Sequence, residues 1–173
     1  GDAGEIAAGL NYLHETGRSL ITIDGVPPEF DRSRTNRAAF ASWQAGFGAF
    51  DAQLAGRYDD NSAYGGESTF QVAAGWKLAE AWRLYASWGE GFRAPSFNEL
   101  YYPGYSNPLL KPEASRSTEL SLRREGAAWS VQANAYQTRV DDLIAYDSTL
   151  FAPNNVEQAR IRGVELVATA QLA

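Results

Sequence analysis

The stretch WSVQANAYQT, residues 129–138, alternates between two kinds of side chain over its whole length. On an extended chain one face would be apolar and the other polar: Trp129, Val131, Ala133 and Ala135 against Ser130, Gln132, Asn134 and Tyr136. Successive side chains of a β-strand point to opposite faces, so this period of two predicts a strand with one apolar side.

Seven other segments alternate in the same way, and the sequence has no helical periodicity of useful length. They are residues 5–14, 36–47, 50–59, 70–78, 82–90, 116–124 and 158–172. We therefore predict an all-β protein, built as an antiparallel up-and-down meander of about eight strands.

Composition excludes several classes of function. Apolar residues make up 45% and charged residues 21% of the 173 residues, which is ordinary for a folded protein. The 15 basic and 21 acidic residues give a formal charge of -6, which argues against a nucleic-acid partner. Cysteine is absent and His14 is the single histidine, so neither a thiolate metal site nor a zinc-binding histidine cluster is available. We expect no cofactor and no metal.

The connections between the predicted strands alternate in length. Long connections are expected at 15–35, 60–67, 91–115 and 140–157, and short turns at Gly48, Glu80 and Gly126. In a meander this places every short turn at one end, as in outer-membrane barrels.

Aromatic residues near strand ends fit an interfacial girdle at the level of the lipid headgroups; they are Tyr12, Trp43, Trp76, Trp82 and Trp88. A soluble β-sandwich or barrel, acting as a binding or adhesion module, would use the same aromatics as core. The pattern of alternation and aromatic residues is compatible with both the membrane barrel and the soluble β-sheet module.

Two pairs of neighbouring carboxylates are candidates for acid–base chemistry, Asp59 with Asp60 and Asp141 with Asp142. On a strand, neighbours point to opposite faces, so neither pair forms a general acid–base couple. We expect them to solvate loops or form turns, since Asp hydrogen-bonds its own backbone. Calcium binding stays open, although the spacing of an EF-hand loop is absent. The protein is therefore not expected to be an enzyme.

The connection GFRAPSFNELYYPGYSNPLLKPEASRS, residues 91–117, holds four of the seven prolines. Proline fixes φ and removes a backbone donor, which keeps this connection from extending the flanking hairpin. Its candidate ligand-binding residues combine apolar area with polar groups, as a large amphipathic ligand requires: Tyr101, Tyr102, Tyr105 and Asn107. The alternative is that these tyrosines only pack the loop against its neighbours.

The same connection resembles a segment late in the barrel of TonB-dependent outer-membrane receptors, closest to the cobalamin (vitamin B12) transporter branch. A second match is VDDLIAYD at 140–147 followed by NVEQARIRGVEL at 155–166, and the resemblance covers about residues 76–170. The matching motif residues are Gly91, Phe92, Arg93, Ala94, Pro95, Asn98, Glu99, Leu100, Tyr101, Lys111, Pro112, Glu113, Arg160, Gly163 and Glu165. Arg93, Pro95 and Glu113 lie where strand meets loop, and we expect them to have a structural role.

This resemblance implies a transmembrane barrel of about 22 strands in the bacterial outer membrane. It also implies capture of cobalamin or a siderophore-type ligand by extracellular loops, contact with outer-membrane lipid, and uptake energised by a TonB-type protein through a plug domain. Residues 1–173 would be a single partial barrel domain, a fragment lacking the plug with its TonB box and the C-terminal strands. Such a fragment could remain an open curved sheet, reclose as a small barrel, or self-associate through its exposed edges.

Overall fold

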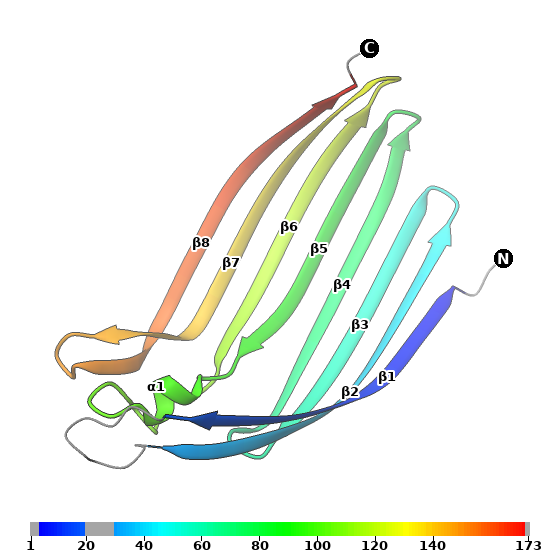
Figure 1. Ribbon diagram of the computed structural model, residues 1–173. Coiled ribbons are helices and arrows are strands. Elements are labelled where there is room, and N and C mark those ends of the chain that lie inside the picture. The colour runs from blue at the N-terminus through cyan, green and yellow to red at the C-terminus, as the bar shows by residue number, and fades with distance from the viewer. Residues whose placement is uncertain (1–3, 20–29, 172–173) are drawn as a thin grey trace.

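The structure is a computed structural model that describes residues 4–19 and 30–171. Its strands, in chain order, are β1 (Glu5–Arg18), β2 (Asp31–Phe47), β3 (Phe50–Asn61), β4 (Gly65–Ala79), β5 (Trp82–Arg93), β6 (Glu113–Glu125), β7 (Trp129–Asp147) and β8 (Ala152–Ala170). A short helix, α1 (Phe97–Tyr101), lies between β5 and β6. Each strand pairs antiparallel with its neighbours in sequence, and all eight form one sheet in the order β1 to β8 (Figure 1). The predicted eight-stranded meander is confirmed.

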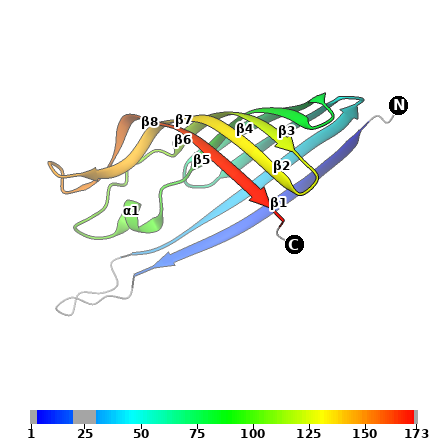
Figure 2. The same ribbon diagram turned by 90° about the horizontal axis from the view of Figure 1, so that it is seen from above.

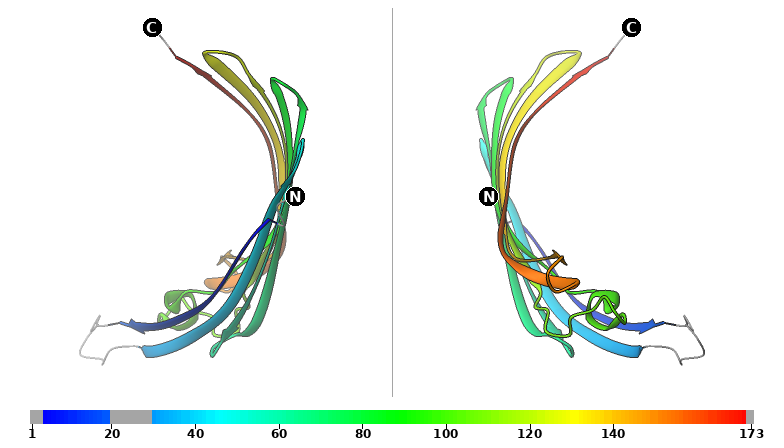
Figure 3. Two further views of the ribbon diagram at one scale, coloured as in Figure 1. Left: turned by 90° about the vertical axis from the view of Figure 1, so that its right-hand side faces the viewer. Right: turned by 90° about the vertical axis from the view of Figure 1, so that its left-hand side faces the viewer.

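The sheet is open and strongly curved, with β1 and β8 as its edges (Figure 3). We call the end that carries the turns 48–49, 80–81 and 126–128 the turn end. The opposite end, with the connections 62–64, 94–112 and 148–151, is the loop end (Figure 1). All short turns predicted at one end do lie together there.

Three of the expected long connections have different bounds in the structure. The connection expected at 60–67 was wrong in length, because β3 and β4 are joined by residues 62–64 and Gly65 adopts a φ of 87° that permits the tight turn. The connection expected at 140–157 was also wrong, since β7 continues past Asp142, at a φ of 55°, and only 148–151 join it to β8. The connection expected at 91–115 is shortened to 94–112 and contains α1.

The connection expected at 15–35 is shorter as well. β1 continues to Arg18 and β2 begins at Asp31, and residues 20–29 lie outside the described part of the chain.

Most apolar side chains of the sheet are exposed rather than packed in a core. Leu10 is 87% and Val164 82% exposed, and within residues 4–19 and 30–171 the buried apolar side chains are few: Phe30, Ala38, Ala45, Pro95, Leu100, Leu110 and Pro153. A single-layer sheet has no second layer to cover its apolar face. The soluble sandwich required a second sheet, and the described residues form one sheet only.

The polar face of the sheet is its concave face. Arg34, which belongs to the polar alternation, donates to the carbonyl of Pro95 in the connection 94–112, and that connection lies on the concave side (Figure 2). The apolar alternation is therefore on the convex side, as in a barrel with lipid outside and a polar lumen.

Aromatic rings gather on the convex face at the turn end, where Phe50 stacks on Trp76 with ring centroids 5.3 Å apart. The guanidinium of Arg124 lies over Trp82 and Trp129, 5.3 and 5.4 Å from the ring centroids. Trp76 and Trp82 thus lie at a strand end, as expected. Trp43 does not, because β2 continues to Phe47; it lines an apolar groove of the convex face together with Trp88. No helix in the described ranges is long and apolar enough to cross a membrane.

Candidate functional site at the loop end

Arg93, the last residue of β5, joins four parts of the loop end. Its guanidinium donates to both oxygens of Glu113 at the start of β6, with distances of 2.9 Å from Nε and 2.7 Å from Nη2. It also donates to Glu99 of α1 at 3.3 Å, and Glu113 accepts the backbone N–H of Ile144 in β7 at 2.8 Å. A two-point pairing of guanidinium and carboxylate is strong and fixes geometry.

These contacts change the acidity of the pair. Hydrogen bonding from Arg93 lowers the pKa of Glu113, and hydrogen bonding to Glu113 raises the pKa of Arg93. Glu113 is therefore ionised, and the two ends of the long connection are held together by charge.

Helix α1 begins with a reciprocal cap. The Ser96 hydroxyl accepts the N–H of Glu99 at 3.2 Å, and the Glu99 carboxylate accepts the N–H of Ser96 at 2.7 Å. Glu99 also pairs with Arg93, so the cap that begins α1 is tied to the end of β5. Leu100 is the buried residue of α1.

On one side, the connection 94–112 contacts β1 and β2. Arg34 donates to the carbonyl of Pro95 at 2.7 Å and to Glu15 at 2.7 Å, and its guanidinium lies 4.9 Å from the ring centroid of Phe97. Gly17 lies so close to the Phe97 ring that a Cβ there would overlap it. The contact between Arg34 and Pro95 links residues 61 positions apart in sequence.

On the other side, the same connection contacts β7 and β8. Tyr105 stacks on Tyr146 with centroids 5.9 Å apart and planes 10° apart. Asn107 donates to the carbonyl of Pro153 at 3.2 Å. Asn155 accepts the Lys111 N–H at 2.9 Å and donates to the Lys111 carbonyl at 3.1 Å. The connection 94–112 therefore spans the concave side from β1–β2 to β7–β8 (Figure 2).

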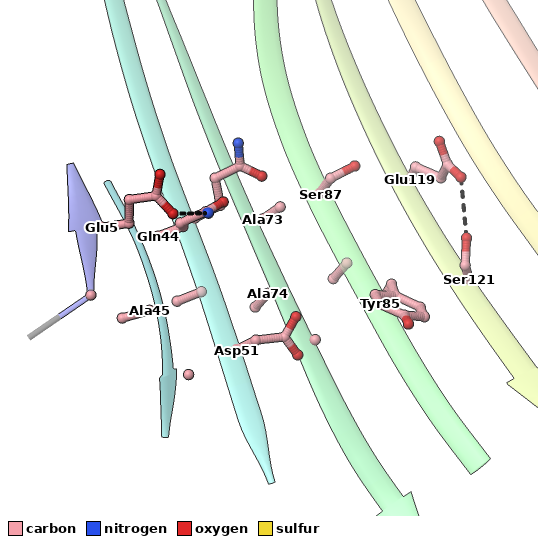
Figure 4. A pocket seen from close by; sticks show the side chains of 16 residues that line it. Glu5, Gln44, Ala45, Asp51, Ala73, Ala74, Tyr85, Ser87, Glu119 and Ser121 are labelled. Carbon is pink, nitrogen blue, oxygen red and sulfur yellow. Dashed lines mark hydrogen bonds between the residues drawn. The ribbon is translucent and has the colours of Figure 1, made fainter. Parts of the chain in front are cut away.

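Nearer the turn end, the concave face contains a hollow of about 620 Å³ between β1 and β6, lined by polar and small apolar residues. Its carboxylates are Glu5, Asp51 and Glu119, and none of the described residues that line it is a lysine or arginine. Gln44 donates to Glu5 and Ser121 to Glu119, both at 3.1 Å (Figure 4). Gly75 is directly opposite Asp51 in the sheet, and a Cβ at residue 75 would overlap the Asp51 carboxylate. The absence of a side chain at Gly75 therefore leaves room for this carboxylate in the hollow.

Asp59 does not solvate a loop, and that prediction was wrong. It lies in β3, is 2% exposed, and accepts hydrogen bonds from Arg57 at 2.7 Å and Asn36 at 2.6 Å. Among the described residues no group of three or more His, Cys, Asp or Glu could hold a metal ion.

A family model described as "TonB dependent receptor-like, beta-barrel" matches residues 1–173. The chain belongs to the TonB-dependent receptor β-barrel family. Proteins of this family are outer-membrane barrels that work with TonB in transport rather than catalysis.

Relatives of this receptor chain include proteins named vitamin B12 transporter BtuB. The protein from Vibrio vulnificus is 32% identical over 170 residues, which is 94% of this chain and 27% of the relative. The protein from Photobacterium profundum is 40% identical over 121 residues, 65% of this chain and 20% of the relative. The chain thus spans about a quarter of the length of these curated relatives.

Solved structures share the fold of this receptor chain. The copper transporter OprC superposes with a TM-score of 0.79 at 20% identity, covering 99% of this chain and 32% of that one. The siderophore receptor PirA from Pseudomonas aeruginosa gives 0.78 at 18% identity, with coverages of 93% and 32%. At these identities the likeness concerns the fold alone.

The predicted ligand residues of the receptor chain differ in their surroundings. Tyr101 packs on Phe30, with centroids 6.1 Å apart, while Tyr105 and Asn107 have the partners given above. Tyr102 is half-buried, and within the described ranges its side chain has no ring or hydrogen-bonding partner. Tyr105 is 41% exposed although its ring stacks on Tyr146, so Tyr102 differs from it in having no such contact with the described residues.

The motif residues do not form one site. Ser115 donates to the carbonyl of Gly91, Phe92 packs edge-on against Tyr64, and Pro95 is fully buried. Several belong to the loop end: Ala94, Asn98, Glu99, Leu100, Lys111 and Pro112. The other three motif residues, Arg160, Gly163 and Glu165, lie on β8. Glu165 accepts a hydrogen bond from Asn134, Gly163 lies against Tyr136, and Arg160 is exposed on the convex face.

Sequence reasoning missed the residues that receive the connection, above all Arg34, Tyr146 and Asn155. Arg34 belongs to the polar alternation of β2, and this alternation is the feature of the sequence that predicts its side chain to lie on the polar face of the sheet. Nothing local in the sequence indicates that Asn155 bonds to Lys111.

Proposed function

We propose that this chain is part of an outer-membrane active-transport receptor that captures cobalamin, or a similar large chelate, at the loop end. The observation that carries the proposal is the connection 94–112, held across the concave side by Arg34 and by Asn155. The names of the curated relatives support cobalamin as the ligand.

A connection that is already held in place loses little conformational freedom when it receives a ligand. Tyr102 offers an amphipathic ring beside this fixed backbone, which suits a ligand with both apolar and polar surface. Uptake would be energised by a TonB-type protein acting through a plug domain, which the proposal places outside residues 1–173.

Equilibrium binding of cyanocobalamin to the detergent-purified receptor that carries this chain tests the proposal. We expect Tyr102→Ala to weaken binding about tenfold, as loss of a well-packed aromatic contact does. Tyr12→Ala, on the convex face, is the matched control and should bind normally. Binding of a ferric siderophore with no cobalamin binding would overturn the choice of ligand.

Residues 1–173 alone should bind cyanocobalamin weakly or not at all, because capture in the proposal needs the plug and the rest of the barrel. Nanomolar affinity of the isolated chain would show that this dependence is wrong.

A further inference from the structure

Three arginines lie side by side on β6, β7 and β8. Arg116 is directly opposite Arg139, and Arg139 is directly opposite Arg160. They belong to the alternation that carries the apolar convex face, as Leu120 does on β6. Directly opposed residues have Cβ atoms about 4.5–5.5 Å apart, and like charges at this spacing destabilise a sheet. We call Arg116, Arg139 and Arg160 the arginine row.

The acidic residues beside the row compensate it only at one end. Glu90 is opposite Arg116 on β5, 3.7 Å from its Nε, and Asp141 lies 3.6 Å from its Nη1. Within the described ranges, neither Arg139 nor Arg160 has an ion pair, and the Nε of Arg139 is buried without a hydrogen-bond partner. The row thus presents two uncompensated guanidinium groups.

The row lies where the apolar part of the convex face ends. On β8 the next outward residues toward the turn end are Arg162, then Val164 and Leu166, which are 82% and 72% exposed. On β6, Leu120 and Leu122 occupy the same part of the face, 51% and 37% exposed. A tilted barrel strand crosses the hydrocarbon in about 9–11 residues, and the part of β6 from Arg116 to Arg124, both arginines included, has nine residues. The row therefore sits at the depth of lipid headgroups on the loop side.

We propose that the arginine row binds the phosphate of a membrane lipid whose acyl chains lie along the apolar convex face of β6–β8. The planar guanidinium matches phosphate with paired, charge-assisted hydrogen bonds, and adjacent forks can share its oxygens. A bound phosphate would also relieve the repulsion between Arg139 and Arg160. Continuity with the exposed Leu120, Val164 and Leu166 favours a lipid over free phosphate, because only a lipid covers them.

The test is native mass spectrometry of the detergent-purified protein with three probes: phosphatidic acid, diacylglycerol with the same acyl chains, and inorganic phosphate. We expect the double variant Arg139→Gln/Arg160→Gln to weaken phosphatidic acid binding about tenfold. Diacylglycerol binding should be the same in all variants.

Arg37→Gln is the matched control, since Arg37 is also exposed on the convex face near the loop end but is opposite Tyr12 and Asp60. It should leave phosphatidic acid binding unchanged. An equal loss in Arg37→Gln, unchanged binding in the double variant, or saturation of the site by inorganic phosphate alone would each overturn the proposal.

Circular dichroism checks that the double variant folds. If it does not, Arg160→Lys, which retains the charge and loses the planar fork, is the second variant. It should reduce phosphatidic acid binding severalfold, and an unchanged affinity would count against the proposal.

Discussion

Arg93 and Glu113 show how much of the loop end depends on one pair of side chains. Their two-point contact joins the two ends of the connection 94–112. Glu113 Oε1 also accepts a hydrogen bond from the backbone N–H of Ile144. A partner removed from such a site leaves the other charge without compensation. The pair belongs to the motif identified in the sequence, and it lies where β5 and β6 meet the connection 94–112.

Glu113→Gln should lower the free energy of unfolding by about 1–3 kcal/mol, because it removes charge-assisted hydrogen bonds at a buried position. Urea titration of the protein in detergent measures the change. Glu125→Gln is the control: its ion pair with Arg123 is exposed and should contribute less than about 1 kcal/mol. Equal effects of the two substitutions would contradict the importance of the Arg93 contact.

The same pair gives stability a defined dependence on pH. The folded-state pKa of Glu113 is below its ordinary value of 4.5, so its contribution is complete above that pH and is lost as the pH falls through the lowered value. The difference in unfolding midpoint between the wild type and Glu113→Gln should therefore shrink below about pH 4. A difference that persists unchanged at the lowest accessible pH would show that the charge is not responsible.

At the scale of elements, the connection 94–112 is positioned by what it touches. Its helix α1 has five residues, too few to be stable alone, and it is held by the Ser96–Glu99 cap and by Phe97 packed on Gly17. The absence of a Cβ at residue 17 is what lets the ring approach β1.

Gly17→Ala should displace Phe97 and loosen the connection, destabilising the protein by about 1–3 kcal/mol as overpacking does. Limited proteolysis should cut faster within residues 94–112. Gly46→Ala is the matched control, since a Cβ there meets only the Phe50 carbonyl, at 4.0 Å, and it should leave the cleavage rate unchanged. Protection of 94–112 in Gly17→Ala would contradict the packing described.

The alternation of apolar and polar residues predicted where the strands lie. It did not predict where the strands end or which residues distant in sequence come into contact. Residues 129–138 were predicted as a strand, but β7 continues to Asp147, past the point where alternation is interrupted by Asp142 at positive φ. Pro153 falls within the connection expected at 140–157, although it lies fully buried in β8. The contacts of Arg34 with Pro95 depend on the curvature of the whole sheet, which no local pattern specifies.

At the scale of the whole molecule, the exposed convex face and the two free edges determine how the chain behaves outside lipid. Ile6, Leu10, Val164 and Leu166 are each more than two-thirds exposed. Exposed apolar faces and open strand edges drive association in water.

Residues 1–173 alone should therefore be oligomeric or aggregated in plain buffer and monomeric in detergent, as light scattering after size-exclusion chromatography would measure. A monodisperse monomer in buffer without detergent would show that the convex face is not adapted to lipid.

The two-sided attachment of the connection 94–112 also sets an order of assembly. Every strand pairs with its sequence neighbour, so the hairpins can form early through local contacts, whereas Arg34–Pro95 and Asn107–Pro153 join residues 61 and 46 positions apart. The connection can acquire its shape only after β1–β2 and β7–β8 both stand in the curved sheet. We therefore expect the connection 94–112 to become ordered last, after the strands that it contacts have paired.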